Sequence, residues 1–266
     1  MLVGLAAGLL AALLFGVAAV VQAQAARRMP SGVGLVGFVL HSLRDPLMLA
    51  VVAAYLGGFV LHAVSIWYLP LYLAQAAISL SMPITALAAI VHLQEELGAV
   101  RWAAVVGVTL GLALLAIGSG EAGTAEATAG FAIALWAATG LIVALGFRSG
   151  GWPGGLLGTL AGMGYAGSAI AVRGVATPVT LVVVVTALSV PVLGLVAFWI
   201  YSSALDRSSV AAATGPLIVA QTFVPAAVGV IALGDGVRSW TAVLLGLVVA
   251  TGATIVLSRE QGRIAA

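Results

Sequence analysis

Residues 178–201 read PVTLVVVVTALSVPVLGLVAFWIY, an apolar stretch without a single charged side chain. A helix needs roughly 20 such residues to cross the ~30 Å hydrocarbon core of a bilayer. Similar stretches recur along the chain, and the short breaks between them hold Arg, Asp, Glu, Gly or Pro. Because backbone groups in lipid must be hydrogen-bonded within their own segment, these stretches are predicted to be helices.

The sequence therefore predicts an all-α polytopic membrane protein. Hydrophobic residues are 63% of the chain and charged residues only 7%, whereas soluble domains carry about 25% charged residues. We expect nine spans: Leu2–Val21, Leu47–Ile66, Leu71–Leu93, Trp102–Gly118, Ala129–Phe147, Gly154–Val172, Pro178–Tyr201, Ser209–Leu233 and Trp240–Leu257. Ser31–Leu43 is too short for a span and is expected to be interfacial or re-entrant, with ten spans as the alternative.

Arginine alone reports orientation, because the chain has no Lys. With nine spans, one side holds Arg27, Arg28, Arg44, Arg101, Arg148, Arg207, Arg259 and Arg263, and the other holds Arg173 and Arg238. By the positive-inside rule the first side is cytoplasmic. We expect a multi-pass protein of the cytoplasmic membrane with its C-terminus in the cytoplasm. Residues 2–25 also resemble a signal peptide, but without a basic start, so a retained helix is expected.

The chain is predicted to consist of two inverted repeats, 1–121 and 122–260, within one membrane domain. A shift of 139 residues places Glu96 on Asp235, Gly107 on Gly246 and Glu121 on Glu260. Five spans separate equivalent points, so the two halves face opposite ways. Many secondary transporters are built in this way, with the substrate site at the midplane between the repeats.

Two segments carry a resemblance to a known family. Residues 70–118 read PLYLAQAAISLSMPITALAAIVHLQEELGAVRWAAVVGVTLGLALLAIG, and residues 215–256 read GPLIVAQTFVPAAVGVIALGDGVRSWTAVLLGLVVATGATIV. Each has a Pro-containing helix, an acidic residue at its end, a basic residue a few positions on, and a last helix with Gly. This layout resembles the drug/metabolite transporter superfamily, including its EamA-like proteins, although Asp235 stands where the family pattern has Glu. The nine-span layout, without a full second helix in the first half, resembles the NIPA-type magnesium transporter branch.

Polar and aromatic residues inside the spans are the candidate substrate-binding residues: Gln75, Trp136, Tyr165 and Gln221. Pro216 and Pro225 flank Gln221, which predicts a helix broken at the site. Tyr55 and Phe59 also lie deep enough to line a cavity. Aromatic residues at span ends, Tyr201 among them, are expected to form an interface belt.

His62, His92 and Glu96 are candidate proton-coupling residues. Histidine changes charge most easily near neutral pH, and His92 and Glu96 are four residues apart, so they share a helix face. The alternative for His92 is a structural hydrogen bond at the interface. Glu96 and Asp235 lie at span ends, where the alternative role is pairing with Arg101 and Arg238.

The composition of the span interiors favours a neutral or amphipathic solute. No Asp, Glu or Arg lies in the central third of any predicted span, whereas a magnesium path prefers carboxylates among its oxygen ligands. We expect a secondary transporter with a small-molecule substrate. The alternatives are a NIPA-like divalent cation transporter and a non-transporting membrane scaffold subunit.

Other classes of function have no support in the sequence. HExxH, CxxC, GxSxG and P-loop motifs are missing and cysteine is absent, so we expect no enzyme activity, no cofactor and no metal site. The arginines are scattered without a basic stripe, so nucleic acid is not an expected partner. Membrane lipid is an expected partner. Glycine pairs four residues apart, such as those at 4 and 8, 107 and 111, and 154, 158 and 162, predict close helix packing and leave a homodimer open.

Overall fold

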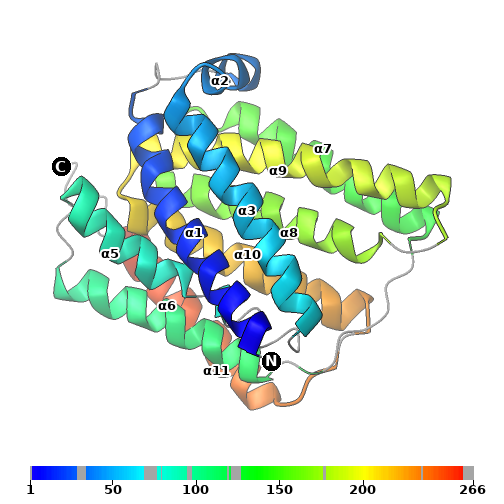
Figure 1. Ribbon diagram of the computed structural model, residues 1–266. Helices are drawn as coiled ribbons and strands as arrows, with labels where there is room; N and C mark the ends of the chain where they lie inside the picture. The colour runs from blue at the N-terminus through cyan, green and yellow to red at the C-terminus, as the bar shows by residue number, and fades with distance from the viewer. Residues whose placement is uncertain are drawn as a thin grey trace.

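The computed structural model describes residues 2–28, 34–68, 77–78, 80–94, 98–118, 120, 127–175, 178–234 and 236–259, with the main chain alone at 63, 66–68, 226, 254 and 257–259. The elements in these ranges are helices (Figure 1). They are α1 (Leu2–Ala26), α2 (Leu35–Ser42), α3 (Pro46–Tyr68), α5 (Ser81–Leu93), α6 (Ala99–Gly118), α7 (Ala129–Arg148), α8 (Gly154–Arg173), α9 (Leu181–Arg207), α10 (Val210–Ala232) and α11 (Trp240–Arg259).

Several of these helices are long and apolar enough to cross a membrane. Within the described residues six helices meet both conditions: α1, α6, α7, α8, α9 and α10. The bent pair α2 and α3 raises that number to seven if it counts as one span. Large apolar side chains such as Ile133 and Val248 are exposed, as lipid contact requires. The chain is thus an all-α protein of the multi-pass membrane class.

Two of the nine expected spans, Leu71–Leu93 and Trp240–Leu257, do not meet both conditions in the described residues. α11 coincides with the expected span Trp240–Leu257, and its first part, Trp240–Ala253, is a short apolar helix. α5 covers the second half of Leu71–Leu93, and residues 71–76 and 79 lie outside the described part of the chain. Six or seven spans are long and apolar enough within the described residues, and the expected total of nine spans stays a prediction.

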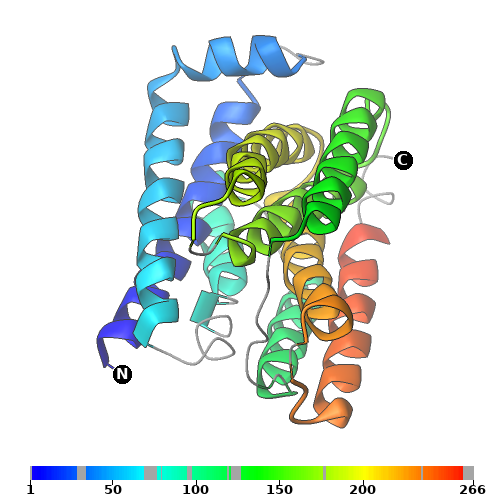
Figure 2. The same ribbon diagram turned by 90° about the vertical axis from the view of Figure 1, so that its right-hand side faces the viewer.

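The segment Ser31–Leu43 does not contain a full span. Its described part forms the eight-residue helix α2, about 12 Å long at 1.5 Å per residue, which is far below the ~30 Å thickness of the hydrocarbon core. α2 meets α3 at 95° and lies across the ends of α1 and α3 (Figure 2). Asp45 begins α3, because its Oδ1 accepts a hydrogen bond from the Leu47 amide at 2.9 Å.

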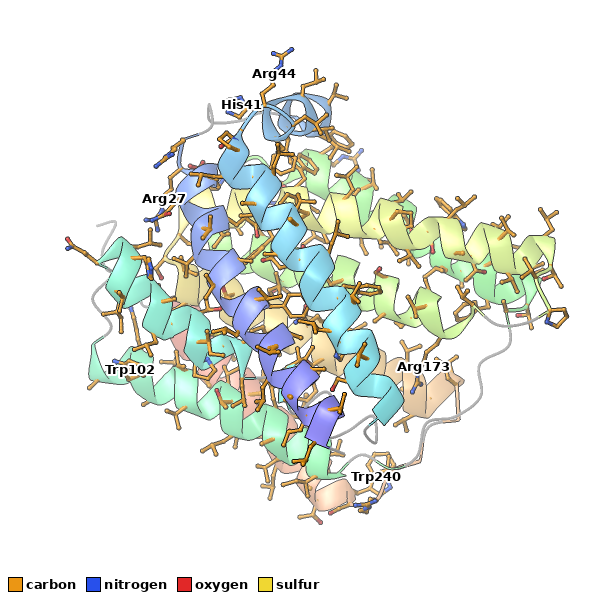
Figure 3. All side chains as sticks on the ribbon, in the orientation of Figure 1. Arg27, His41, Arg44, Trp102, Arg173 and Trp240 are labelled. Carbon is orange, nitrogen blue, oxygen red and sulfur yellow. The ribbon has the colours of Figure 1, made fainter. Side chains whose placement is uncertain are left out.

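The long helices run between two ends of the bundle. Arg27, His41 and Arg44 lie at one end, and Arg173 and Trp240 at the other (Figure 3). At the first end Arg207 Nη1 donates to the carbonyl oxygens of Ser149 and Trp152, at 3.0 and 3.3 Å, and so joins the α9–α10 and α7–α8 connections.

At the other end, the Arg238 amide donates to the Gly118 carbonyl at 2.9 Å. This bond joins the connection that precedes α11 to the end of α6. We call the first end the arginine-rich end and the second the opposite end. The arginine-rich end holds the C-terminal ends of α1, α7 and α9 and the N-terminal ends of α3 and α6 (Figure 1), where the sequence has Arg27, Arg28, Arg148, Arg207, Arg44 and Arg101.

Glycines allow two helices to approach each other closely at three crossings. At the α6–α11 crossing, a Cβ on Gly111 would come within 2.7 Å of the Ala250 Cβ. At the α8–α10 crossing, a Cβ on Gly158 would overlap the Ala213 carbonyl oxygen. At the α1–α3 crossing, a Cβ on Gly8 would lie 2.8 Å from Ser65 Oγ. The predicted close packing at these spacings is confirmed, and it occurs within one chain.

The predicted break in α10 is wrong. The helix continues from Val210 to Ala232 through both Pro216 and Pro225. Each proline removes only one backbone N–H, and the turns between the two prolines keep their own hydrogen bonds. Gln221, which lies between them, is half-buried on this continuous helix.

Candidate functional site

The predicted substrate-binding residues lie on three different helices. Gln75 lies outside the described residues. Trp136 is on α7, and its indole Nε1 donates to the Val185 carbonyl oxygen of α9 at 3.0 Å. Tyr165 on α8 and Gln221 on α10 are half-buried. α8 packs against both α7 and α10, so Tyr165 is on the helix between the other two. A cavity common to all four residues stays a prediction.

The candidate proton-coupling residues are not brought together by the described contacts. His62 is half-buried on α3, and its Nδ1 is buried without a hydrogen-bond partner among the described residues. His92 is exposed on α5, with its Nδ1 3.1 Å from the Ala88 carbonyl oxygen. Glu96 lies outside the described residues, as does Asp235, so pairing through these acids stays a prediction.

A buried hydrogen-bond network joins α1, α3 and α9 near the arginine-rich end. Gln22 on α1 is 0% exposed. Its Nε2 donates to Ser202 Oγ at 2.7 Å and to the Phe198 carbonyl oxygen at 3.4 Å, both on α9. Its Oε1 accepts from the Tyr55 hydroxyl of α3 at 2.9 Å. An unpaired buried amide would cost roughly 1–3 kcal/mol, and here both ends of the amide are paired.

Aromatic rings surround this network. Tyr55 stacks on Phe15 with ring centroids 5.8 Å apart, and it meets Phe198 edge-on at 5.9 Å. Phe38 of α2 meets the same Phe198 ring at 5.6 Å. We call Gln22, Tyr55, Phe198 and Ser202 the Gln22 cluster. The side chains of this cluster join α1 to α3 and to α9, and Phe38 of α2 packs against the cluster.

A second buried polar pair lies on the neighbouring helices. The hydroxyls of Tyr201 on α9 and Thr214 on α10 are 2.5 Å apart. Both residues are buried, so this pair joins α9 to α10 inside the bundle.

One of the aromatic predictions is wrong. Tyr201 was expected in the interface belt, yet it is 2% exposed and hydrogen-bonded in the core. The reason is that α9 continues to Arg207, which places Tyr201 more than one turn inside the helix end. Phe59 is 53% exposed on α3, and its place in a cavity stays a prediction.

The prediction from sequence missed Gln22 because it ended the first span at Val21. The helix continues to Ala26, and so Gln22 lies inside it. A glutamine one residue beyond an apolar run, followed by three alanines and a second glutamine up to Arg27, is the signal that could have extended the span. Alanine favours a helix, and the buried alanines after Gln22 belong to the face of α1 that packs against the other helices.

The chemistry of these groups is neutral. Amide and hydroxyl groups donate and accept hydrogen bonds, and aromatic rings offer apolar faces. Among the residues the structure describes, no group of three or more His, Asp or Glu side chains is placed to hold a metal ion. No protein family, curated protein or solved structure matches the chain.

Proposed function

We propose that the chain is built from two inverted repeats within a nine-span bundle. Helix ends support a shift of 139 residues. α3 ends at Tyr68 and α9 at Arg207 (68 + 139 = 207), and α5 ends at Leu93 and α10 at Ala232 (93 + 139 = 232). α3 and α9 run in opposite directions between the two ends of the bundle (Figure 1), as inversion requires.

Contacts between α6 and α11 support the same shift. Gly111 faces Ala250, and 111 + 139 = 250, so this pair maps onto itself. A Cβ on Gly107 would lie 3.0 Å from the Ala253 Cβ, and one on Gly246 would lie 3.2 Å from the Leu114 Cβ. These two contacts exchange under the shift (107 + 139 = 246 and 114 + 139 = 253). A pseudo-two-fold axis through Gly111 and Ala250 explains all three contacts.

The packing of α1 and α8 extends the relation. α1 packs on α3 and α5, and α8 packs on α9 and α10. Gly8 of α1 faces Ser65, and Gly154 of α8 faces Ser208 and the carbonyl oxygen of Ala204, the equivalent of Ser65 (65 + 139 = 204). The two glycines are 146 residues apart (154 − 8 = 146), so α8 is offset by seven residues from the shift that relates the other helices. We propose α1, α3, α5 and α6 as one repeat and α8 to α11 as the other. α7 then has no counterpart, which refines the boundaries 1–121 and 122–260.

We further propose that the protein is a secondary transporter of the drug/metabolite type that moves a small neutral or amphipathic solute by alternating access. The Gln22 cluster is the observation that carries this proposal. The two repeats meet there through amide, hydroxyl and aromatic groups, and these groups suit uncharged solutes better than Mg²⁺, which prefers carboxylate ligands. Rocking of one repeat against the other would expose the interface to each side in turn.

The substrate site is tested by variants of residues on helices that flank the interface. Trp136→Ala and Gln221→Ala are expected to lower solute flux in proteoliposomes by about tenfold or more at matched folded protein, because each removes a group that would contact solute. Glu96→Gln is the comparison variant, since an acid at a helix end acts chiefly in pairing, and it should leave flux within about twofold. Flux that falls only with Glu96→Gln would contradict this site.

Orientation is tested by labelling single cysteines in intact cells. The chain has no cysteine, so a cysteine placed at position 29 or at the C-terminus is measured without background. We expect a membrane-impermeant maleimide to label neither in intact cells and both after permeabilisation, because the positive-inside rule places the arginine-rich end in the cytoplasm. Labelling of position 29 alone would support ten spans, and labelling of the C-terminus would reverse the orientation.

A further inference from the structure

The two repeats are packed differently at the two ends of the bundle. At the arginine-rich end α9 packs against α1 and donates Ser202 and Phe198 to the Gln22 cluster. Under the repeat relation, the equivalent pair at the opposite end is α3 with α8. Among the described residues those two helices share no comparable interface. Of the two equivalent helix pairs, α1 with α9 and α3 with α8, only the first forms an interface among the described residues.

Equivalent aromatic residues show the same difference. Phe198 corresponds to Phe59 (59 + 139 = 198), and both are phenylalanine. Phe198 is engaged by the rings of Tyr55 and Phe38, whereas Phe59 is 53% exposed. Because the two residues occupy equivalent faces of equivalent helices, the face of α3 that carries Phe59 is the one that would meet α8 if the opposite end closed.

We propose that the Gln22 cluster is the gate at the arginine-rich end and that Phe59 is the gate residue of the opposite end, the two closing in alternation. This inference rests on the proposed transport function. It identifies the present structure as the state that is closed at the arginine-rich end. Opening that end requires the Gln22–Ser202 hydrogen bond to break, because Gln22 belongs to one repeat and Ser202 to the other.

The two gates differ in chemistry. The residue equivalent to Ser202 is Ala63 (63 + 139 = 202), which offers no hydroxyl, and α8 offers no glutamine along its length. The opposite gate would then close through apolar contact of Phe59, without the hydrogen bond. A gate that holds a buried hydrogen bond is the stronger of the two, which favours the state seen here.

Two reporter cysteines test this alternation without any substrate. Ala18→Cys lies one turn deeper than Gln22 on the same face of α1, where Ala18 is buried, and Leu56→Cys lies three residues from Phe59 on α3. Each is labelled in proteoliposomes by an impermeant thiol reagent, the first from the arginine-rich side and the second from the opposite side. In the otherwise unchanged chain we expect slow labelling of the first reporter and fast labelling of the second.

Gln22→Leu is expected to raise labelling of the Ala18→Cys reporter by about fivefold or more, because it removes the hydrogen bonds from Gln22 to Ser202 and to the Phe198 carbonyl oxygen of the other repeat. It should lower labelling of the Leu56→Cys reporter, since each molecule that opens one end closes the other. Ser202→Ala is the milder variant and should act in the same direction. Tyr201→Phe is the matched control, because it removes an equally buried hydrogen bond that lies within one repeat, and it should change neither rate.

Reciprocal change of the two labelling rates would support the gate. A rise at both reporters would show general loosening and would overturn it, as would an equal effect of Tyr201→Phe or no change with both gate variants. Reciprocal labelling without flux of any solute would retain the gate and overturn the transport proposal. Solute flux with unchanged labelling would overturn the gate alone.

Discussion

Gly158→Val is expected to destabilise the protein by about 3 kcal/mol or more, because added volume at a close-packed position cannot be relieved by side-chain movement. At Gly158 the new Cβ would overlap the Ala213 carbonyl oxygen, which is backbone. α8 and α10 would have to separate, although each is held along its length. We expect the midpoint of thermal aggregation in detergent to fall by roughly 6–12 °C.

The matched control is Gly140→Val, in the interior of α7. A Cβ at Gly140 would meet nothing within 4 Å, and valine has a better helix propensity than glycine. We expect the midpoint to stay within about 3 °C of the parent protein. Equal losses for the two variants would mean that the α8–α10 crossing is not as close as described.

The double variant Gly107→Cys with Ala253→Cys is expected to form a disulfide in nearly every molecule under mild oxidation. The Cβ atoms at these positions would be 3.0 Å apart, slightly inside the range of ~3.5–4.5 Å for disulfides, so a small shift of α6 against α11 suffices. A protease site inserted at the exposed turn of Gly150 and Gly151 gives two fragments. These should stay joined on a non-reducing gel.

Gly107→Cys paired with Gly252→Cys is the control, because a Cβ at Gly252 meets nothing within 4 Å. This pair should give separate fragments under the same conditions. The comparison is sensitive to a shift of one residue in the register of α6 against α11. Efficient cross-linking of the control pair would contradict that register, and with it the pseudo-two-fold axis through Gly111 and Ala250.

Hydrophobicity alone predicted where the helices lie. α7 and α8 begin and end within about one residue of the expected spans, because lipid imposes one requirement on every long apolar run. The described part of the segment before α3 is the short helix α2, and an interfacial or re-entrant position for it stays a prediction. The glycine pairs at α6 and α8 predicted close packing, since only small side chains let two backbones approach each other.

The candidate site was much harder to predict. Gln22 was missed because the apolar run ends one residue before it, although the helix continues to Ala26. Tyr201 was assigned to the membrane interface because it is the last residue of the apolar run. The sequence did not indicate that α9 continues beyond this run to Arg207. Which helix faces which is decided by tertiary packing, and the hydrogen bond between Gln22 and Ser202 joins residues 180 positions apart.

Solute flux in proteoliposomes is the most direct test of the proposed transporter. Vesicles with the purified protein are offered a mixture of neutral and amphipathic metabolites, with uptake read by mass spectrometry, and Mg²⁺ in parallel, read by an indicator inside. We expect at least one organic solute to enter faster than into protein-free vesicles, with no uptake of Mg²⁺ above background. Uptake of Mg²⁺ that is lost with Glu96→Gln, without transport of any organic solute, would contradict the proposal.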